Sequence, residues 1–415
     1  MERSEKNKKS ASIYFTSYKK PLTLINLMFL AWGFMTVVNS YLLDTLKPEL
    51  GLSLEYQLFN NIFFGTFFLM ALPAAYLIRA IGYKKAFLSG LALASASVLF
   101  MVPGAHQINL TLVCIAIFVM ASGFTLLQVA ANPYILITGE PRKGSARLSL
   151  AGAFNSFGAW LAPFIGMIIT TLEATNTQSS ASLVIKPYIL LSTIFIGIAV
   201  LLYYSDLPNL KSSNEINTNI KNDQRKFIVQ YPHVILGAIA IFCYVGSEMV
   251  IFKTLNDSYI VDELGLDTLE KVVLWIVPFY WGGMMFGRFV GNLVLKFYTP
   301  AKVLVVCSVF AILLSLSGMY NTSFGALFSV LGLGIFHSVM WPIIFKLGTH
   351  GLGKFIEFGS ALLIMGIVGG AFIPEFSLSF FPEFGRTSLM IPIICYAFIL
   401  IYGIFGHRYN KIEEY

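Results

Sequence analysis

Long apolar stretches alternate with short polar ones along nearly the whole chain. The stretches at 22–43 and 303–319 hold no charged residue, and each can cross roughly 30 Å of hydrocarbon as a helix. A backbone in lipid must satisfy its own hydrogen bonds, and the alternating segments of a β-barrel are missing from this sequence. The pattern therefore predicts an all-α membrane protein with twelve transmembrane helices, at 22–46, 57–79, 84–103, 107–138, 144–171, 187–206, 231–254, 269–298, 301–319, 323–349, 355–381 and 386–406.

The longest polar stretch lies in the middle of the chain, at 207–230. Its composition is that of a flexible linker, so it divides the helices into two groups of six. The expected organisation is a cytoplasmic tail, a six-helix bundle, a cytoplasmic linker, a second six-helix bundle and a second cytoplasmic tail, at 1–21, 22–206, 207–230, 231–406 and 407–415.

The two groups of helices repeat one pattern of residues. Gly123, Gln128 and Pro133 in one predicted helix recur 209 residues later as Gly332, His337 and Pro342. The same offset relates Asn39 to Glu248, and a third helix pair shares the spacing of Gly158 with Pro163 and of Gly369 with Pro374. Matches in three helix pairs, in order, predict two pseudo-symmetric bundles. Transporters built from such repeats bind their substrate between the halves, near the middle of the membrane.

Composition and charge support a membrane location. Hydrophobic residues make up 57% of the chain and charged residues 12%, against about 25% charged in soluble domains. The net charge of +7 does not indicate nucleic-acid binding, because the Lys and Arg residues cluster on every second loop. The positive-inside rule then places both termini in the cytoplasm, as expected for a multi-pass protein of the cell inner membrane. Residues 1–21 are polar and basic, so no cleavable signal peptide is expected.

A few polar residues interrupt the predicted spans. A charge at the centre of a span costs roughly 2.5–3.5 kcal/mol on insertion scales, so such residues usually face a cavity or a partner. Amides, one carboxylate and an aromatic ring suit a neutral monosaccharide, whose hydroxyls need paired donors and acceptors and whose apolar face packs on the ring. The predicted substrate-binding residues are Asn39, Gln128, Asn132, Asn155, Glu248, His337 and Trp341.

Some of these residues have an equally good structural interpretation. Asn132 could bond backbone groups freed by Pro133, since amides also join helices to one another. His337 could serve either role. Glu248 is different because it lies mid-helix with no cation one turn away, which favours a functional acid that couples transport to protons. Asp44 is a second candidate for coupling, although it could lie at the outer interface beside Lys47.

Three basic residues are expected to have gating or structural roles. Arg288 lies inside a span and is a better partner for an acid than for a sugar, while Arg79 and Lys84 flank the loop between the second and third helices. The four cysteines lie in predicted helices without metal-binding spacing. With no HExxH or GxSxG motif in the sequence, we expect no enzyme activity, no catalytic residues, no cofactor and no metal.

Six short motifs resemble those of the fucose–galactose–glucose:proton symporter family of the major facilitators. The resemblance runs from about residue 22 to 380. The motifs are WGFMTVVN at 32–39, RAIGYKK at 79–85, LQVAANPY at 127–134, RLSLAGAFNSFG at 147–158, FCYVGSE at 242–248 and YWGGMMFGRF at 280–289.

This resemblance implies the major facilitator fold and the import of a hexose or deoxyhexose such as glucose, galactose or fucose, by proton symport and alternating access. The expected partners are the sugar, a coupling proton and the lipid bilayer, and we expect a monomer. Gln128 and Ser40 stand where members of the family carry acids, Gly152 where Gln is common and His337 where Asn is common. Glu248 is then the expected coupling acid, with Asp44 as its rival. An exporter or a sodium-coupled carrier on the same fold is the alternative.

Overall fold

The computed structural model describes residues 19–52, 57–138, 140–174, 180–207, 228–256, 271–321, 323–381 and 385–406. These residues are almost entirely helical, and no strand occurs among them. The helices of the first half are α2 (Lys19–Leu46), α3 (Leu58–Ile81), α4 (Tyr83–Ala96), α5 (Val98–His106), α6 (Leu110–Ile137), η1 (Pro141–Lys143), α7 (Gly144–Ala174) and α8 (Ser180–Tyr204). The expected tails at 1–21 and 407–415 and the linker at 207–230 lie largely outside the described residues.

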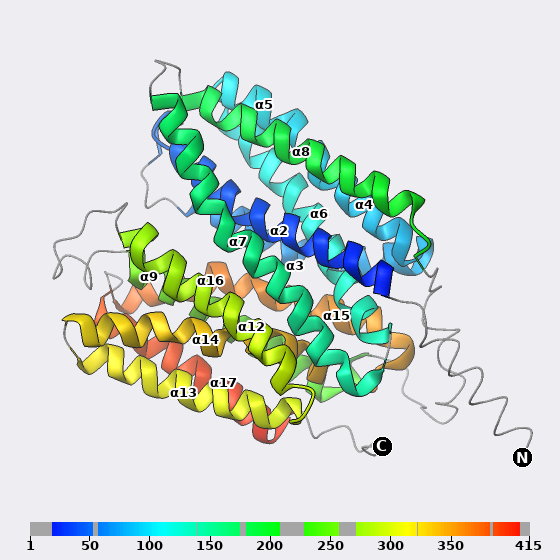
Figure 1. Cartoon of the computed structure of the whole chain (residues 1–415), viewed down its shortest axis with the longest axis vertical. Coiled ribbons are helices and arrows are strands. Elements are labelled where there is room, and N and C mark those ends of the chain that lie inside the picture. Colours follow the sequence, from blue (N-terminus) through cyan, green and yellow to red (C-terminus); the bar gives the residue numbers. More distant parts are fainter. Residues whose placement is uncertain are drawn as a thin grey trace, which may run out of the picture.

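The second half repeats this plan with more interruptions. Its elements are η2 (Ile228–Gln230), α9 (Pro232–Asn256), η3 (Lys271–Trp281), α12 (Gly282–Val294), α13 (Pro300–Tyr320), α14 (Ser323–Gly348), η4 (Gly353–Phe355), α15 (Ile356–Met365), η5 (Gly366–Val368), α16 (Gly369–Phe380), η6 (Arg386–Leu389) and α17 (Met390–Ile404). The helices of the first half gather in the upper part of Figure 1 and those of the second half in the lower part.

The predicted twelve spans are confirmed. Ten helical segments within the described ranges are long and apolar enough to cross a membrane, and α7 and the joined pair η3–α12 complete the set.

Three spans differ from the expected continuous helices. The helix expected at 84–103 breaks at Ser97, whose hydroxyl donates to the carbonyl of Ala94 at 2.7 Å and so competes with the helical backbone. The span at 355–381 is interrupted by η5, and the span at 269–298 begins as the π-helix η3 around Pro278. Proline has no amide donor and π-turns are common at such irregularities, which accounts for the π-helical geometry of η3.

Close helix packing follows the repeated sequence pattern. A Cβ atom added to Gly158 of α7 would lie 2.1 Å from the carbonyl oxygen of Leu30 in α2. The equivalent Gly369 of α16 is as close to α9, because its Cβ would lie 2.1 Å from the carbonyl oxygen of Phe242. These backbone approaches require glycine, and they occur between corresponding helices of the two halves. The predicted pair of pseudo-symmetric bundles is confirmed.

Basic side chains complete the helix ends at one end of the molecule, called here the basic end. Arg147 donates to the backbone carbonyls of Ile135, Leu136 and Glu140 at 2.7–3.1 Å, near the end of α6. Lys84 donates to the carbonyls of Tyr203 and Ser205 at 2.9 and 2.6 Å, at the end of α8. Cations at helix C-termini satisfy free carbonyls and the helix dipole, so Lys84 has a structural contact within the first half.

Candidate functional site

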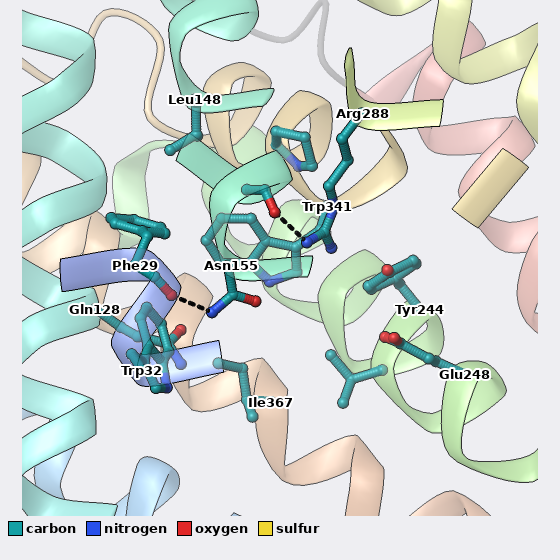
Figure 2. A pocket seen from close by; sticks show the side chains of 13 residues that line it. Phe29, Trp32, Gln128, Leu148, Asn155, Tyr244, Glu248, Arg288, Trp341 and Ile367 are labelled. Atoms are coloured by element: carbon teal, nitrogen blue, oxygen red, sulfur yellow. Dashed lines mark hydrogen bonds between the residues drawn. The ribbon is translucent and has the colours of Figure 1, made fainter. Parts of the chain in front are cut away.

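A cavity of about 200 Å³ lies between the two halves. The first half contributes α2, α6 and α7 to its wall, and the second half contributes α9, α12, α14 and η5. The side chains in Figure 2 are those that line it: Phe29, Trp32, Gln128, Leu148, Gly152, Asn155, Tyr244, Val245, Glu248, Arg288, Trp341, Pro342 and Ile367. Pockets for drug-sized ligands hold about 300–1,000 Å³, so this cavity suits a smaller molecule.

The wall from the first half combines amides with aromatic rings. The Asn155 amide donates to the backbone carbonyl of Phe29 at 3.0 Å, which fixes the side chain and leaves its oxygen free to accept (Figure 2). Trp32 packs against Phe29 and Phe124, with ring centroids 5.4 and 6.0 Å apart. Gln128 lies beside Trp32 and adds both an amide donor and an amide acceptor. This wall can hold an apolar ring face and several hydroxyl groups together.

The wall from the second half carries the acid. Glu248 and Tyr244 are one turn apart on α9, and both side chains reach the cavity (Figure 2). Trp341 of α14 is fixed by stacking on Phe345, with centroids 5.1 Å apart and planes at 18°. An indole thus faces the cavity from each half, and each can donate one N–H bond.

Arg288 crosses from the second half to the first. Its Nη1 donates to the carbonyl of Gly152 at 2.8 Å and to the hydroxyl of Ser156 at 2.6 Å, while its Nε donates to the carbonyl of Ser338 at 3.0 Å. A Cβ on Gly152 would lie 3.3 Å from the Arg288 Cδ, so the bare backbone at this position admits the side chain. Glu248 interacts electrostatically with Arg288, but the two form no ion pair within 4.0 Å.

Three of the predicted binding residues do not line the cavity. Asn39 accepts a hydrogen bond from Tyr188 of α8. The Asn132 amide donates to the carbonyl of Gln128 one turn earlier, at 2.8 Å, which is a contact within α6. His337 is fully buried between helices of the second half. The side chain of Asp44 lies outside the described part of the structure.

The contacts of His337 join three helices. Its Nδ1 is 3.1 Å from the hydroxyl of Tyr280 in η3, and its Nε2 is 2.5 Å from the hydroxyl of Tyr396 in α17. The edge of the Tyr244 ring packs against the imidazole, with centroids 5.8 Å apart. His337 therefore supports the wall of the cavity from behind.

Further contacts between the halves lie at the basic end. The Arg79 guanidinium lies over the ring of Phe358, 5.1 Å from its centroid, and the Tyr83 hydroxyl donates to Glu357 at 3.3 Å. The Asn292 amide donates to the carbonyl of Ala146 at 2.6 Å. These contacts join α3 and α4 to α15, and α7 to α12, so they close this end of the interface. Arg79 thus contacts the second half at this end.

Within the described residues, a side-chain hydrogen bond also joins the halves at the opposite end. The Asn61 amide donates to the Glu375 carboxylate at 2.5 Å, between the start of α3 and the later part of α16. The cavity thus lies between two sets of contacts, one at each end.

Three aromatic residues that line the cavity were not predicted from the sequence as ligands. Phe29 and Trp32 lie three residues apart on α2, and Tyr244 is one turn before Glu248. The spacing from Tyr244 to Glu248 was a usable signal, because residues four apart share a helix face. Phe29 and Trp32 had weaker signals, since the chain has 37 Phe and many of its aromatic residues face outward.

Comparison with known proteins identifies relatives of the whole chain. Residues 23–374 match the family model of the Major Facilitator Superfamily. A glucose/galactose transporter of Brucella abortus is 36% identical over 396 residues, which cover 94% of this chain and 95% of that protein. A crystal structure of the Escherichia coli fucose:proton symporter FucP has a TM-score of 0.81 at 26% identity and covers 94% of this chain and 99% of that one. A structure of FucP in the outward conformation has a TM-score of 0.79 at 26% identity, with the same coverage.

Proposed function

The chain belongs to the Major Facilitator Superfamily, and we propose that it is a secondary transporter that imports a neutral monosaccharide together with protons. Its relatives are permeases, so the chain is a transporter and not an enzyme. One relative is a glucose/galactose transporter and one solved neighbour is a fucose:proton symporter. A hexose or a deoxyhexose is therefore the proposed substrate class.

The observation that carries this proposal is the set of groups facing one cavity. Gln128 and Asn155 come from the first half, Glu248 from the second, and an indole from each half completes the lining. Sugar hydroxyls both donate and accept, so they need amides and carboxylates in mixed arrangement, while the apolar face of the sugar ring packs on an aromatic surface. A cavity with groups from both halves can also close around its ligand when the halves rock.

Glu248 is the proposed coupling acid. The family resemblance places the neutral residues Gln128 and Ser40 where members carry acids, and we propose that the titratable group lies elsewhere. Glu248 faces the cavity from α9 and can bind a proton and a sugar hydroxyl from one position. Asp44 on α2 is the alternative acid.

The proposed orientation follows the distribution of charge. We infer that both termini and the basic end face the cytoplasm, in a monomer embedded in the inner membrane. The bundles at 22–206 and 231–406 then rock against each other, joined by the linker at 207–230. The contacts at the basic end close the cavity on the cytoplasmic side.

Uptake of a panel of radiolabelled monosaccharides into proteoliposomes tests the function. We expect saturable uptake of a hexose or deoxyhexose that increases when the external side is acidified. Uptake that instead follows a sodium gradient, or export of the sugar from loaded vesicles alone, would contradict the proposal.

Removing a cavity amide should weaken sugar binding. Gln128→Ala leaves sugar hydroxyls without a partner inside the cavity, and we expect a loss of roughly 1–3 kcal/mol, a change of about 5–150-fold in affinity. Binding to purified protein can be measured by calorimetry, with Asn155→Ala as a second cavity variant. Asn321→Ala, at a surface position, is the control. Unchanged affinity in both cavity variants would exclude this site.

Shortening the linker should have little effect. Deleting about five residues from the middle of 207–230 changes the loop-closure free energy by less than about 1 kcal/mol. We expect uptake per molecule of expressed protein to stay near that of the wild type. Lost transport at normal expression would show that the segment does more than tether the halves.

A further inference from the structure

Arg288 and Glu248 belong to the same half of the protein, and two of the acceptors of Arg288 belong to the other. Glu248 is on α9 and Arg288 on α12, whereas Gly152 and Ser156 are on α7. Rocking of the halves therefore changes the distance from Arg288 to Gly152 and Ser156, while Glu248 and Arg288 move together. In this structure α7 and α12 are in contact, and the guanidinium is held on α7 (Figure 2).

The bare backbone of Gly152 gives Arg288 room beside α7, since a Cβ there would lie 3.3 Å from the Arg288 Cδ. With no Cβ at this position, Arg288 reaches the Gly152 carbonyl at 2.8 Å and the Ser156 hydroxyl at 2.6 Å. The third bond, from Nε to the carbonyl of Ser338, lies within the second half and can persist when the halves separate. Separation would thus free one edge of the guanidinium and leave the other attached.

Among the titratable groups in the described part of the chain, Arg288 is the cation that interacts with Glu248. The other groups are hydroxyls: Tyr244 from the same helix, Tyr280 from η3 and Tyr396 from α17. His337 of α14 lies behind them and is engaged by Tyr280 and Tyr396. A buried carboxyl keeps its proton unless a cation compensates its charge. A change in the position of Arg288 relative to Glu248 would therefore alter the balance between the protonated and the charged form of this acid.

We propose that Arg288 exchanges partners during transport, from Gly152 and Ser156 when α7 and α12 are closed to Glu248 when they separate at the basic end. In the closed arrangement Glu248 holds a proton and the sugar. On separation the guanidinium turns to Glu248, the O–H bond breaks, the electron pair stays on the carboxylate and the proton leaves to water on the basic side. This exchange rests on the proposed role of Glu248 in coupling, and it makes Arg288 the residue that drives proton release.

Two serine variants separate this exchange from simple loosening of the helices. Ser156→Ala removes an acceptor of the guanidinium. Ser149→Ala removes a bond between the same two helices, in which the Ser149 hydroxyl donates to the backbone carbonyl of Arg288 at 2.9 Å. We expect Ser156→Ala to shift half-maximal uptake to roughly tenfold higher external proton concentration, since the freed guanidinium competes with the proton for Glu248. Ser149→Ala should keep the wild-type pH profile, whatever its maximal rate. Identical pH profiles for the two variants would overturn the proposal.

A neutral side chain at position 288 gives an independent test. Arg288→Gln in proteoliposomes should lose net uptake at neutral internal pH by a much larger factor than it loses sugar exchange, which needs no proton release. Net uptake should recover as the internal pH is raised, because a low proton concentration then replaces the missing cation. Wild-type net uptake at neutral internal pH would overturn the proposal, and if this variant does not fold, the serine pair decides.

Different results would contradict the coupling role of Glu248 and the partner exchange of Arg288. If Glu248→Gln still accumulates sugar in response to a pH gradient, the coupling role of Glu248 is wrong and the partner exchange falls with it. If Glu248→Gln loses accumulation while Arg288→Gln keeps the wild-type dependence on internal pH, coupling by Glu248 stands and the exchange by Arg288 is excluded.

Discussion

Glu248→Gln is expected to abolish concentrative sugar uptake while sugar exchange across the membrane continues. Glutamine keeps the shape of the side chain and most of its hydrogen-bonding capacity, but it cannot bind and release a proton. The cavity would therefore still hold sugar between Gln128, Asn155 and the two indoles. Without a titrating group the internal sugar concentration should rise only to the external one, whatever pH gradient is imposed.

The measurement compares two experiments on the same proteoliposomes. Counterflow of labelled sugar reports exchange, and net uptake under an acid-outside gradient reports coupling. Glu49→Gln is the matched control, because it removes an acid from a loop outside the cavity and should leave both signals intact. If the Glu248 variant concentrates sugar in a pH-dependent way, Asp44 becomes the acid to test.

Gly158→Ala is expected to cost at least about 3 kcal/mol of stability. The variant should misfold or be produced in much lower amounts than the wild type. The added Cβ would lie 2.1 Å from the carbonyl oxygen of Leu30 and 2.8 Å from the amide nitrogen of Phe34. Both are backbone atoms, so no side chain can rotate away and α2 must move as a whole. Overpacking of ordinary cores costs about 1–3 kcal/mol, and a clash between two backbones exceeds that range. Because α2 carries Trp32, its displacement would also distort the cavity.

Thermal unfolding of detergent-solubilised protein, together with its elution profile, measures this effect. Gly197→Ala is the control within the membrane, because a Cβ at this position of α8 meets no atom within 4 Å. It should unfold at or slightly above the wild-type temperature, since alanine favours helix over glycine. Equal unfolding temperatures for the two variants would show that α2 and α7 can separate at little cost.

The pattern of apolar stretches was sufficient to predict the twelve spans and the two halves, because lipid forces each span to be long, apolar and helical. It could not predict the break at Ser97 or the π-turns around Pro278. Those features depend on local competition between a side chain and the backbone, which hardly changes hydropathy.

The candidate site was predicted in part. Gln128, Asn155, Glu248 and Trp341 line one cavity, whereas Asn39, Asn132 and His337 do not. All are polar or amphipathic residues within spans, and the cost of burying them predicts only that each has a partner. The partner can be a ligand or another helix. His337 is satisfied by tyrosines 57 and 59 residues away, whose positions depend on the packing of three helices.

The cluster around His337 also has a mechanical consequence. The hydrogen bonds of His337 join α14 to η3 and α17 behind the cavity. These bonds favour movement of the second half as one rigid body. A rigid second half that tilts to part Glu357 from Tyr83 at one end keeps Glu375 against Asn61 at the other. The two ends of the cavity then cannot be open at the same time. Accumulated sugar therefore has no continuous channel through which to leak back.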